Sequence, residues 1–178
     1  MQFVGLFILG VSATVLIYQD LRSRLISWIM FPLILVAGIM YSLDNASFSI
    51  RGFLKNTSFN LLFLITQFII LKTVFFLRTG NRNAIADRLI GWGDILFLIC
   101  CCVFFSPINF ILFYCLSLIF ILFVHLIVRY WSKKYRSANT VPMAGLQALF
   151  LFTYIIFGEL LNISLSIDTW ILKYLIDS

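Results

Sequence analysis

The chain has 178 residues, of which 62% are hydrophobic and 11% are charged, and its formal net charge is +6. Soluble domains are roughly half apolar, so this composition excludes an ordinary soluble domain and indicates an integral membrane protein. The basic residues lie mostly between apolar runs, which links the charge to membrane topology and lipid headgroups and argues against a nucleic-acid partner.

Apolar runs separated by short polar segments follow one another along the chain. Most of them approach the roughly 20 residues of a membrane-spanning helix and exceed the roughly ten residues of a barrel strand. We therefore predict an all-α polytopic protein with a single membrane domain over residues 1–178. The six predicted transmembrane helices cover residues 4–18, 26–42, 58–77, 94–105, 108–130 and 141–161.

The segments between the predicted spans carry most of the charge. Residues 44–55 and 78–90 are predicted loops, and the basic residues of 131–140 place that segment in water or lipid headgroups. Beyond the sixth span, the apolar residues of 163–176 recur at helical spacing with Asp168 and Lys173 between them. This pattern predicts a C-terminal helix lying on the membrane surface, with a seventh span as the alternative.

The basic residues are unevenly divided between the two sides of the membrane if the six spans alternate. The richer side should be cytoplasmic, which places both termini outside, in a cytoplasmic (inner) membrane. The richer side carries Arg22, Arg24, Arg78, Arg82, Arg88, Arg129, Lys133, Lys134 and Arg136, and the other side carries Arg51, Lys55 and Lys173.

An aspartate stands at the start of the fourth predicted span, in the stretch Ile90-Gly91-Trp92-Gly93-Asp94-Ile95. A carboxylate costs roughly 2.5 to 3.5 kcal/mol at the centre of a membrane helix, so acidic groups kept there are usually functional. Gly91 and Gly93 would let a substrate backbone come close to Asp94. The structural alternative is that Asp94 only caps its helix by accepting a bond from a free N–H group.

Asp20 ends the first predicted span on its way in, and Asp94 begins the fourth on its way out. Both carboxylates therefore belong at the cytoplasmic edge, at similar depth. Two aspartates that meet share a proton, so one can act as a base on water while the other donates a proton to a peptide carbonyl. This chemistry is aspartic proteolysis, and it calls for no metal and no cofactor. Alternatively, the two carboxylates pair with Arg22 and Arg88 or cap helices.

The two acidic segments resemble the signature regions of the type IV prepilin peptidase family of membrane aspartic proteases. The segment from Tyr18 to Ile26 reads YQDLRSRLI and is similar to the family's D-x-R-x-x-x-I-P region, while Gly91 to Asp94 match its G-x-G-D region. Val141 to Gly145 show a weaker likeness to a helix start that follows a basic loop in that family. Two motifs on one predicted face are more specific than either alone.

This resemblance implies a six-helix enzyme that removes a short basic leader from pilin-like or pseudopilin-like precursors at the cytoplasmic membrane face. By residue match, Asp20 and Asp94 would be the catalytic pair, with Gly91 and Gly93 positioning the substrate backbone. The expected partners are the precursor substrate and membrane lipids. A non-catalytic relative that binds pilin-like helices, or a small transporter using the same carboxylates, is the alternative.

The sequence departs from the family pattern at two motif positions. Ser27 stands where the family has its proline, and Leu96 stands where many members have a lysine, which leaves the aspartates in place and affects the expected substrate choice. The N-terminal region with paired C-x-x-C motifs, found in members that also methylate the new N-terminus, is absent from this sequence. We therefore expect no N-methyltransferase activity.

Five further positions carry expectations about their surroundings. Gln147 is expected to hydrogen-bond between helices and Glu159 to be solvated near the outer end of the sixth span. Trp28, Trp131 and Trp170 are expected to lie at the membrane interface as anchors.

Overall fold

The computed structural model describes residues 2–22, 26–43, 48–79, 91–131 and 143–168 of the chain. Within these ranges the ordered elements are all helices and there is no strand, which confirms that the chain is all-α as predicted. The helices are α1 (Gln2–Arg22), α2 (Met30–Leu43), α3 (Ile50–Thr79), α5 (Trp92–Cys101), α6 (Pro107–Trp131) and α8 (Met143–Leu160).

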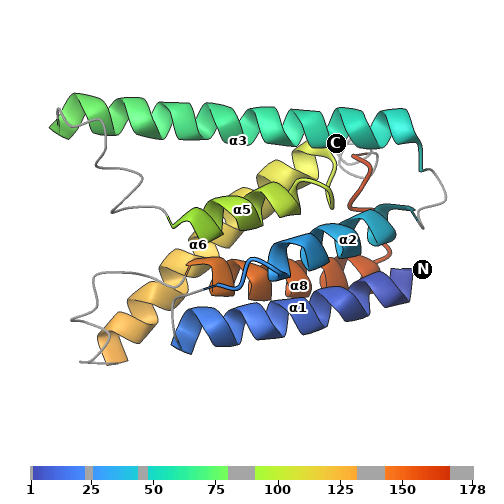
Figure 1. The fold of residues 1–178 in the computed structure, drawn as a ribbon, viewed down its shortest axis with the longest axis horizontal. Helices are drawn as coiled ribbons and strands as arrows, with labels where there is room; N and C mark the ends of the chain where they lie inside the picture. Colours follow the sequence, from blue (N-terminus) through green and yellow to red (C-terminus); the bar gives the residue numbers. More distant parts are fainter. Residues whose placement is uncertain (1, 23–25, 44–47, 80–90, 132–142, 169–178) are drawn as a thin grey trace, which may run out of the picture.

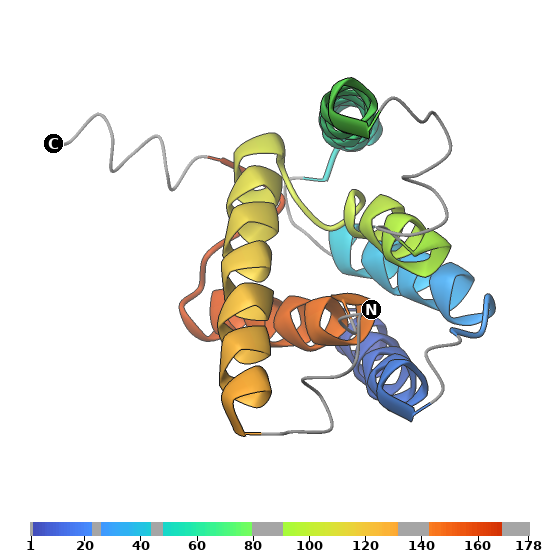
Figure 2. The ribbon, with the colours of Figure 1, turned by 90° about the vertical axis from the view of Figure 1, so that its left-hand side faces the viewer.

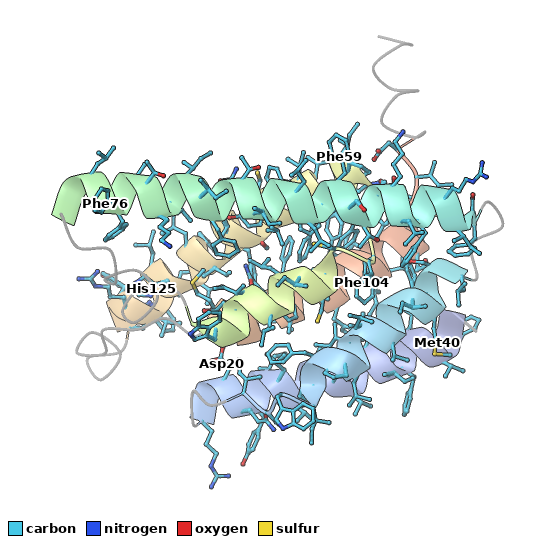
Figure 3. The ribbon with its side chains drawn as sticks, turned by 45° about the horizontal axis from the view of Figure 1, so that its top comes forward. Asp20, Met40, Phe59, Phe76, Phe104 and His125 are labelled. Carbon is cyan, nitrogen blue, oxygen red and sulfur yellow. The ribbon has the colours of Figure 1, made fainter. Side chains whose placement is uncertain are left out.

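The helices alternate in direction along the chain (Figure 1). One end of the molecule gathers the C-terminal ends of α1, α3 and α6 with the N-terminal ends of α2, α5 and α8. Asp20 lies at this end, whereas Met40 and Phe104 lie toward the other (Figure 3). We use the term dyad for Asp20, at the end of α1, and Asp94, at the start of α5. The end of the molecule that carries them is called the dyad end, and the opposite end is called the far end. The alternation agrees with the order of directions that the hydropathy pattern predicted.

Four of these helices, α1, α3, α6 and α8, are long and apolar enough to cross a membrane. The other two are shorter: α2 has 14 residues and α5 has 10. At 1.5 Å per residue they measure roughly 21 and 15 Å, against a hydrocarbon layer of about 30 Å. Helices thus occupy all six predicted ranges, and length and composition identify four of them as candidate spans.

Two predicted boundaries were wrong, at the start of α3 and at the end of α5. The loop predicted over residues 44–55 ends earlier, since α3 already begins at Ile50 and carries Arg51 and Lys55 on its exposed surface. Helix α5 ends at Cys101, four residues before the predicted end, and the buried Asn60 amide donates hydrogen bonds to the carbonyls of Cys102 and Phe105, at 3.0 and 2.9 Å.

The predicted surface helix over 163–176 is also wrong in its first part. Residues 163–168 form turns and irregular structure, and the rest of that prediction lies outside the described residues. Ser106 and Asn109 hold this segment: the Ser106 N–H and the Asn109 side chain both donate to the Leu165 carbonyl, and the Ser106 hydroxyl donates to Asp168 at 2.5 Å. These long-range bonds replace the intrahelical ones that a surface helix would have made.

Most of the core comes from α1, α2, α5, α6 and α8, with Leu64 added from α3, and aromatic rings fill the space between α6 and α8. Phe113 of α6 lies within 5.9 Å, centroid to centroid, of both Phe150 and Tyr154 of α8, and it stacks at 4.9 Å on Phe105. Helix α3 lies at the edge of this core (Figure 2). Only 11% of the most apolar stretch of α3 is buried, compared with 39% of that of α8.

Replacement of Asn60 by alanine is expected to destabilise the fold more than the same change at Asn56. Loss of the Asn60 amide leaves two carbonyls unpaired in the buried turn after α5, at a cost of about 1–3 kcal/mol. Asn56 makes one longer bond of 3.3 Å to the Ser166 carbonyl in a half-buried setting. Thermal unfolding in detergent micelles measures both, and a larger loss for Asn56→Ala would contradict the assignment of Asn60 as the anchor of α3.

Candidate active site

Asp20 occupies the last turn of α1, and its side chain is buried, with 7% of its surface exposed. The backbone N–H of Gly145, in the first turn of α8, donates a hydrogen bond of 2.7 Å to the Asp20 carboxylate oxygen Oδ2. A buried carboxylate needs such a partner, because its desolvation is costly without one. The bond joins two residues that are 125 positions apart in sequence.

Asp94 lies in the first turn of α5 and is half-buried. Its Oδ2 accepts a bond of 3.3 Å from the Gly91 N–H, so the helix-capping interpretation of Asp94 describes one of its contacts. The backbone N–H of Ala144 also donates to its carboxylate, and the charge of Asp20 acts on it electrostatically. Asp94 therefore caps its own helix and also faces Asp20 across the start of α8.

The N-terminus of α8 is the common partner of the two acids. The first N–H groups of a helix have no intrahelical acceptor, and the helix dipole adds a partial positive charge there. Consecutive residues use these groups in α8: Ala144 binds Asp94 and Gly145 binds Asp20. Carboxylates from α1 and α5 thereby bind neighbouring N–H groups of one helix end, which lowers the cost of their mutual repulsion.

The two segments that carry the aspartates also pack directly on each other. A Cβ atom at Gly93 would lie 2.9 Å from the Cδ1 atom of Ile26, so the Ile26 side chain lies directly against Gly93. The Ser27 N–H donates a 2.9 Å bond to the Gln19 side chain. Proline has no N–H group and could not make this bond, which gives the Ser27 departure a local structural role.

Gly91 is exposed, and a Cβ atom built there would lie 3.1 Å from Asp94 Oδ2. Gly93 thus packs against Ile26 and Gly91 against Asp94, so both glycines contact residues that belong to the surroundings of the dyad. The predicted contact of both glycines with a substrate backbone stays a prediction.

The arginine pairing that the sequence left open concerns Arg22 and Arg88. The Arg22 guanidinium donates to the hydroxyl of Tyr18 and lies 5.5 Å from the centroid of the same ring. Arg88 is outside the described residues. The described partner of Arg22 is therefore Tyr18, an aromatic residue one turn earlier on the same helix.

Two expectations for polar residues differ from the structure. Glu159 is half-buried and accepts a hydrogen bond of 2.7 Å from the Tyr41 hydroxyl, so it joins α8 to α2 at the far end instead of being solvated. Gln147 is fully buried, and neither of its amide atoms has a hydrogen-bond partner within the part of the chain that is described, in contrast to the expected interhelical bond.

Exposed tryptophans mark the level of the dyad. Trp28, Trp92 and Trp131 are all exposed and lie at the N-terminal side of α2, the start of α5 and the end of α6, which meet at the dyad end. Tryptophan concentrates at the interface between lipid and water. The three tryptophans therefore belong to the same end of the molecule as Asp20 and His125, which Figure 3 shows, and their place at a membrane interface stays a prediction.

Comparisons with models of protein families, with curated proteins and with solved structures gave no match to the chain. The functional argument therefore rests on the site itself. Sequence reasoning named both carboxylates and missed the groups that hold them, the N–H groups of Ala144 and Gly145. The weak likeness at Val141 to Gly145 was the signal that could have found them, since a helix start is a ready anion site.

Proposed function

We propose that this chain is a membrane aspartic endopeptidase that uses Asp20 and Asp94 to remove the leader peptide of pilin-like precursors. The observation that carries the proposal is the meeting of the two carboxylates on the N–H groups of Ala144 and Gly145. Three segments that are far apart in the sequence contribute to this one site, and each is similar to a region of the prepilin peptidase family. The charge of Asp20 acts on Asp94 at this helix start, and two acids that influence each other are what water-mediated peptide hydrolysis requires.

The mechanism follows from the way two adjacent carboxyl groups share one proton. The ionised carboxylate takes a proton from water as the water oxygen bonds to the scissile carbonyl carbon, and the protonated carboxyl gives its proton to the carbonyl oxygen. The tetrahedral intermediate then collapses: the C–N bond breaks, the leaving nitrogen takes up a proton from the dyad, and a new carboxyl and a new amine result. Each turnover returns one proton to the pair.

The orientation we propose places the dyad end in the cytoplasmic leaflet of a cytoplasmic membrane, with six crossings and both termini outside. Support comes from the basic residues that follow α1, α3 and α6 in sequence, such as Arg24, Arg82 and Lys133, since such residues are enriched on the cytoplasmic side. The short helix α5 begins at the dyad end, with Asp94 in its first turn, so in this orientation it starts in the cytoplasmic leaflet.

The proposed substrate is a precursor with a short basic leader in the cytoplasm and an apolar helix in the membrane. A dyad at the membrane edge can reach the bond between these two parts without drawing the apolar helix out of the lipid. Ser27 and Leu96 differ from the family pattern next to the two aspartates, so the sequence preference around the cut is expected to differ as well. N-methylation of the product is not part of the proposal.

The proposal predicts that the leader disappears from precursor proteins only in cells that produce this chain. The N-termini of membrane proteins are compared by mass spectrometry between cells with and without it, with a pilin-like precursor co-produced. We expect a new N-terminus immediately before the apolar helix, and a precursor that migrates faster on a gel. If the set of N-termini is identical in the two cell populations, the endopeptidase proposal is wrong.

A further inference from the structure

Gln147 lies in α8 shortly after the residues that bind the dyad, and it is fully buried. Neither its Nε2 atom nor its Oε1 atom has a hydrogen-bond partner within the described part of the chain. Buried polar side chains are nearly always hydrogen-bonded, because an unpaired donor or acceptor in the interior lowers the stability of the fold. Packing alone therefore does not account for a glutamine at this position.

Two other buried amides show what a structural role requires. The Asn60 amide nitrogen donates to two carbonyls of the turn after α5, and the Asn109 amide nitrogen donates to the Leu165 carbonyl after α8. The oxygen of Asn109 is unpaired, but its nitrogen still fixes one segment to another. In the described ranges, Gln147 is the only buried side-chain amide that leaves both its nitrogen and its oxygen unpaired.

The position of Gln147 in α8 places it beside the dyad. It is three residues after Ala144, whose N–H binds Asp94, and two residues after Gly145, whose N–H binds Asp20. Residues three apart are neighbours on a helix surface, and long helical side chains lean toward the N-terminus of their helix. A side chain of this length at position 147 therefore extends toward the level at which Ala144 binds Asp94.

Gln147 is also deeper in the bundle than the two N–H groups. Helix α8 begins at the dyad end and runs toward the far end (Figure 1), and three residues of helix advance about 4.5 Å. In the orientation proposed above, Gln147 thus lies on the membrane side of the dyad. This is the side on which the apolar part of a precursor would lie during cleavage.

The precursor brings unpaired backbone groups to this level. The first N–H groups of its apolar helix have no acceptor within that helix, and unpaired peptide groups are costly in an apolar setting. The carboxamide of glutamine carries an acceptor oxygen and two N–H donors, which match the N–H and C=O groups of a peptide backbone. An unpaired, buried glutamine next to the dyad therefore has the chemistry that the precursor backbone needs.

We propose that Gln147 binds the precursor backbone immediately after the scissile bond, with Oε1 accepting from a peptide N–H and Nε2 donating to a peptide C=O. This inference rests on the proposed function and assigns a substrate-positioning residue to the same site. Because the amide is shielded from solvent, water does not compete for these bonds. They hold the scissile carbonyl in place relative to Asp20 and Asp94.

A double-mutant cycle between the chain and its substrate tests these bonds. The probe is a peptide with a short lysine-rich leader, a glycine and an apolar helix of about 20 residues. In a second form of the probe, an ester replaces the first peptide bond after the scissile bond, which removes one N–H group. Binding of both forms is measured in detergent micelles to the Asp20→Asn chain, with and without Gln147→Met, so that cleavage does not interfere. Methionine matches the length of glutamine and is apolar.

We expect the ester probe to bind about tenfold more weakly than the amide probe when Gln147 is present, because one hydrogen bond in a desolvated site is lost. With Gln147→Met, the amide probe should also bind about tenfold more weakly, and the ester should cause no further loss. Two losses that multiply to roughly a hundredfold, equal binding in all four combinations, or no binding of the amide probe would each overturn the inference.

Thermal unfolding separates substrate binding from a structural role. Gln147→Met removes an unpaired buried amide, so its Tm should equal or exceed that of the natural chain. Asn109→Leu is the matched control: it loses the bond to the Leu165 carbonyl, and its Tm should fall by about 2–4 °C, while cleavage per folded molecule is unchanged. A lower Tm for Gln147→Met with unchanged probe binding would assign Gln147 to the fold and overturn the inference.

The cycle also distinguishes an error about Gln147 from an error about the proposed function. If the active chain cuts the amide probe and Gln147→Met binds both probes as the parent chain does, the role of Gln147 is wrong and the endopeptidase proposal stands. If the two changes are coupled in binding and the active chain leaves the amide probe intact, Gln147 binds a peptide backbone and the endopeptidase proposal is wrong.

Discussion

Replacement of Asp20 or Asp94 by asparagine is expected to reduce leader cleavage by roughly 10³-fold, within the range that general acid–base groups contribute. Asparagine keeps the size of the side chain and an oxygen that can accept the Gly145 or Ala144 N–H bond. It cannot share a proton with the remaining carboxyl group. The substitution therefore separates proton transfer from the structural role of holding the start of α8.

The double substitution should be no less active than either single one, because two groups that work as a unit lose their function with the first change. Cleavage of a purified precursor, followed by gel shift and mass spectrometry, provides the measurement. Glu159→Gln is the matched control: Glu159 is an acid at the far end, its bond from Tyr41 can persist with glutamine, and its cleavage rate should equal that of the natural chain.

The outcome also separates the competing functional classes. If the two aspartates only held the start of α8 in place, asparagine could replace each of them. Full cleavage by the two single variants would therefore refute the acid–base role. A small transporter using the same carboxylates would lose an ion-dependent flux in vesicles upon either substitution and would show no precursor cleavage in any form. Both hypotheses use the same two aspartates, so the measurements of precursor cleavage and of ion flux distinguish a peptidase from a transporter.

The asparagine variants should also be at least as stable as the natural chain. Two acids held close together with one largely buried repel each other, and sites of this kind are commonly kept at the expense of stability. A neutral amide relieves the repulsion and keeps the hydrogen bond. This contrast between lower activity and unchanged or higher thermal stability is characteristic of a functional acid and differs from the loss expected for a structural one.

The sequence predicted the order and direction of the helices because hydropathy is a local property. Runs of apolar residues between basic segments, such as those ending before Arg22 and Arg129, are sufficient to place Asp20 and Asp94 at one end. The shared use of the α8 start by the two acids depends instead on the packing of α1 against α8 and of Ile26 against Gly93. No local pattern contains that information, which is why the N–H groups of α8 went unnoticed.

The errors at the end of α5 and after α8 have a similar physical origin. Asn60 bonds to the turn after α5, and Asn109 bonds to the segment after α8, so each element is terminated by a side chain from elsewhere in the chain. The start of α3 was missed for a different reason. Charged residues such as Arg51 and Lys55 suggested a loop, whereas an exposed helical turn accommodates them equally well at a membrane surface.

Gly145→Ala is expected to lower kcat for leader cleavage by about 10- to 100-fold, because small displacements of reacting groups have large effects on rate. A Cβ atom at this position would lie 3.0 Å from Asp20 Oδ2, 3.1 Å from Asp20 Cβ and 3.4 Å from the Cα atom of Ile17. Rotation of the Asp20 side chain can move Oδ2 but not the Cβ atom, whose position the α1 backbone fixes, so the contact at 3.1 Å remains unless α1 moves. We expect α1 to shift and the Asp20 carboxylate to move away from Asp94.

Gly158→Ala separates this effect from a general loss of packing in α8. A Cβ atom there would lie 2.8 Å from the Cδ1 atom of Leu165, so both variants overpack the same helix at a cost of about 1–3 kcal/mol. Gly158 is at the far end, where the dyad is not disturbed. Thermal unfolding should therefore fall in both variants, while kcat per folded molecule falls only for Gly145→Ala; an equal fall in kcat for Gly158→Ala would show that the start of α8 has no special role in positioning Asp20.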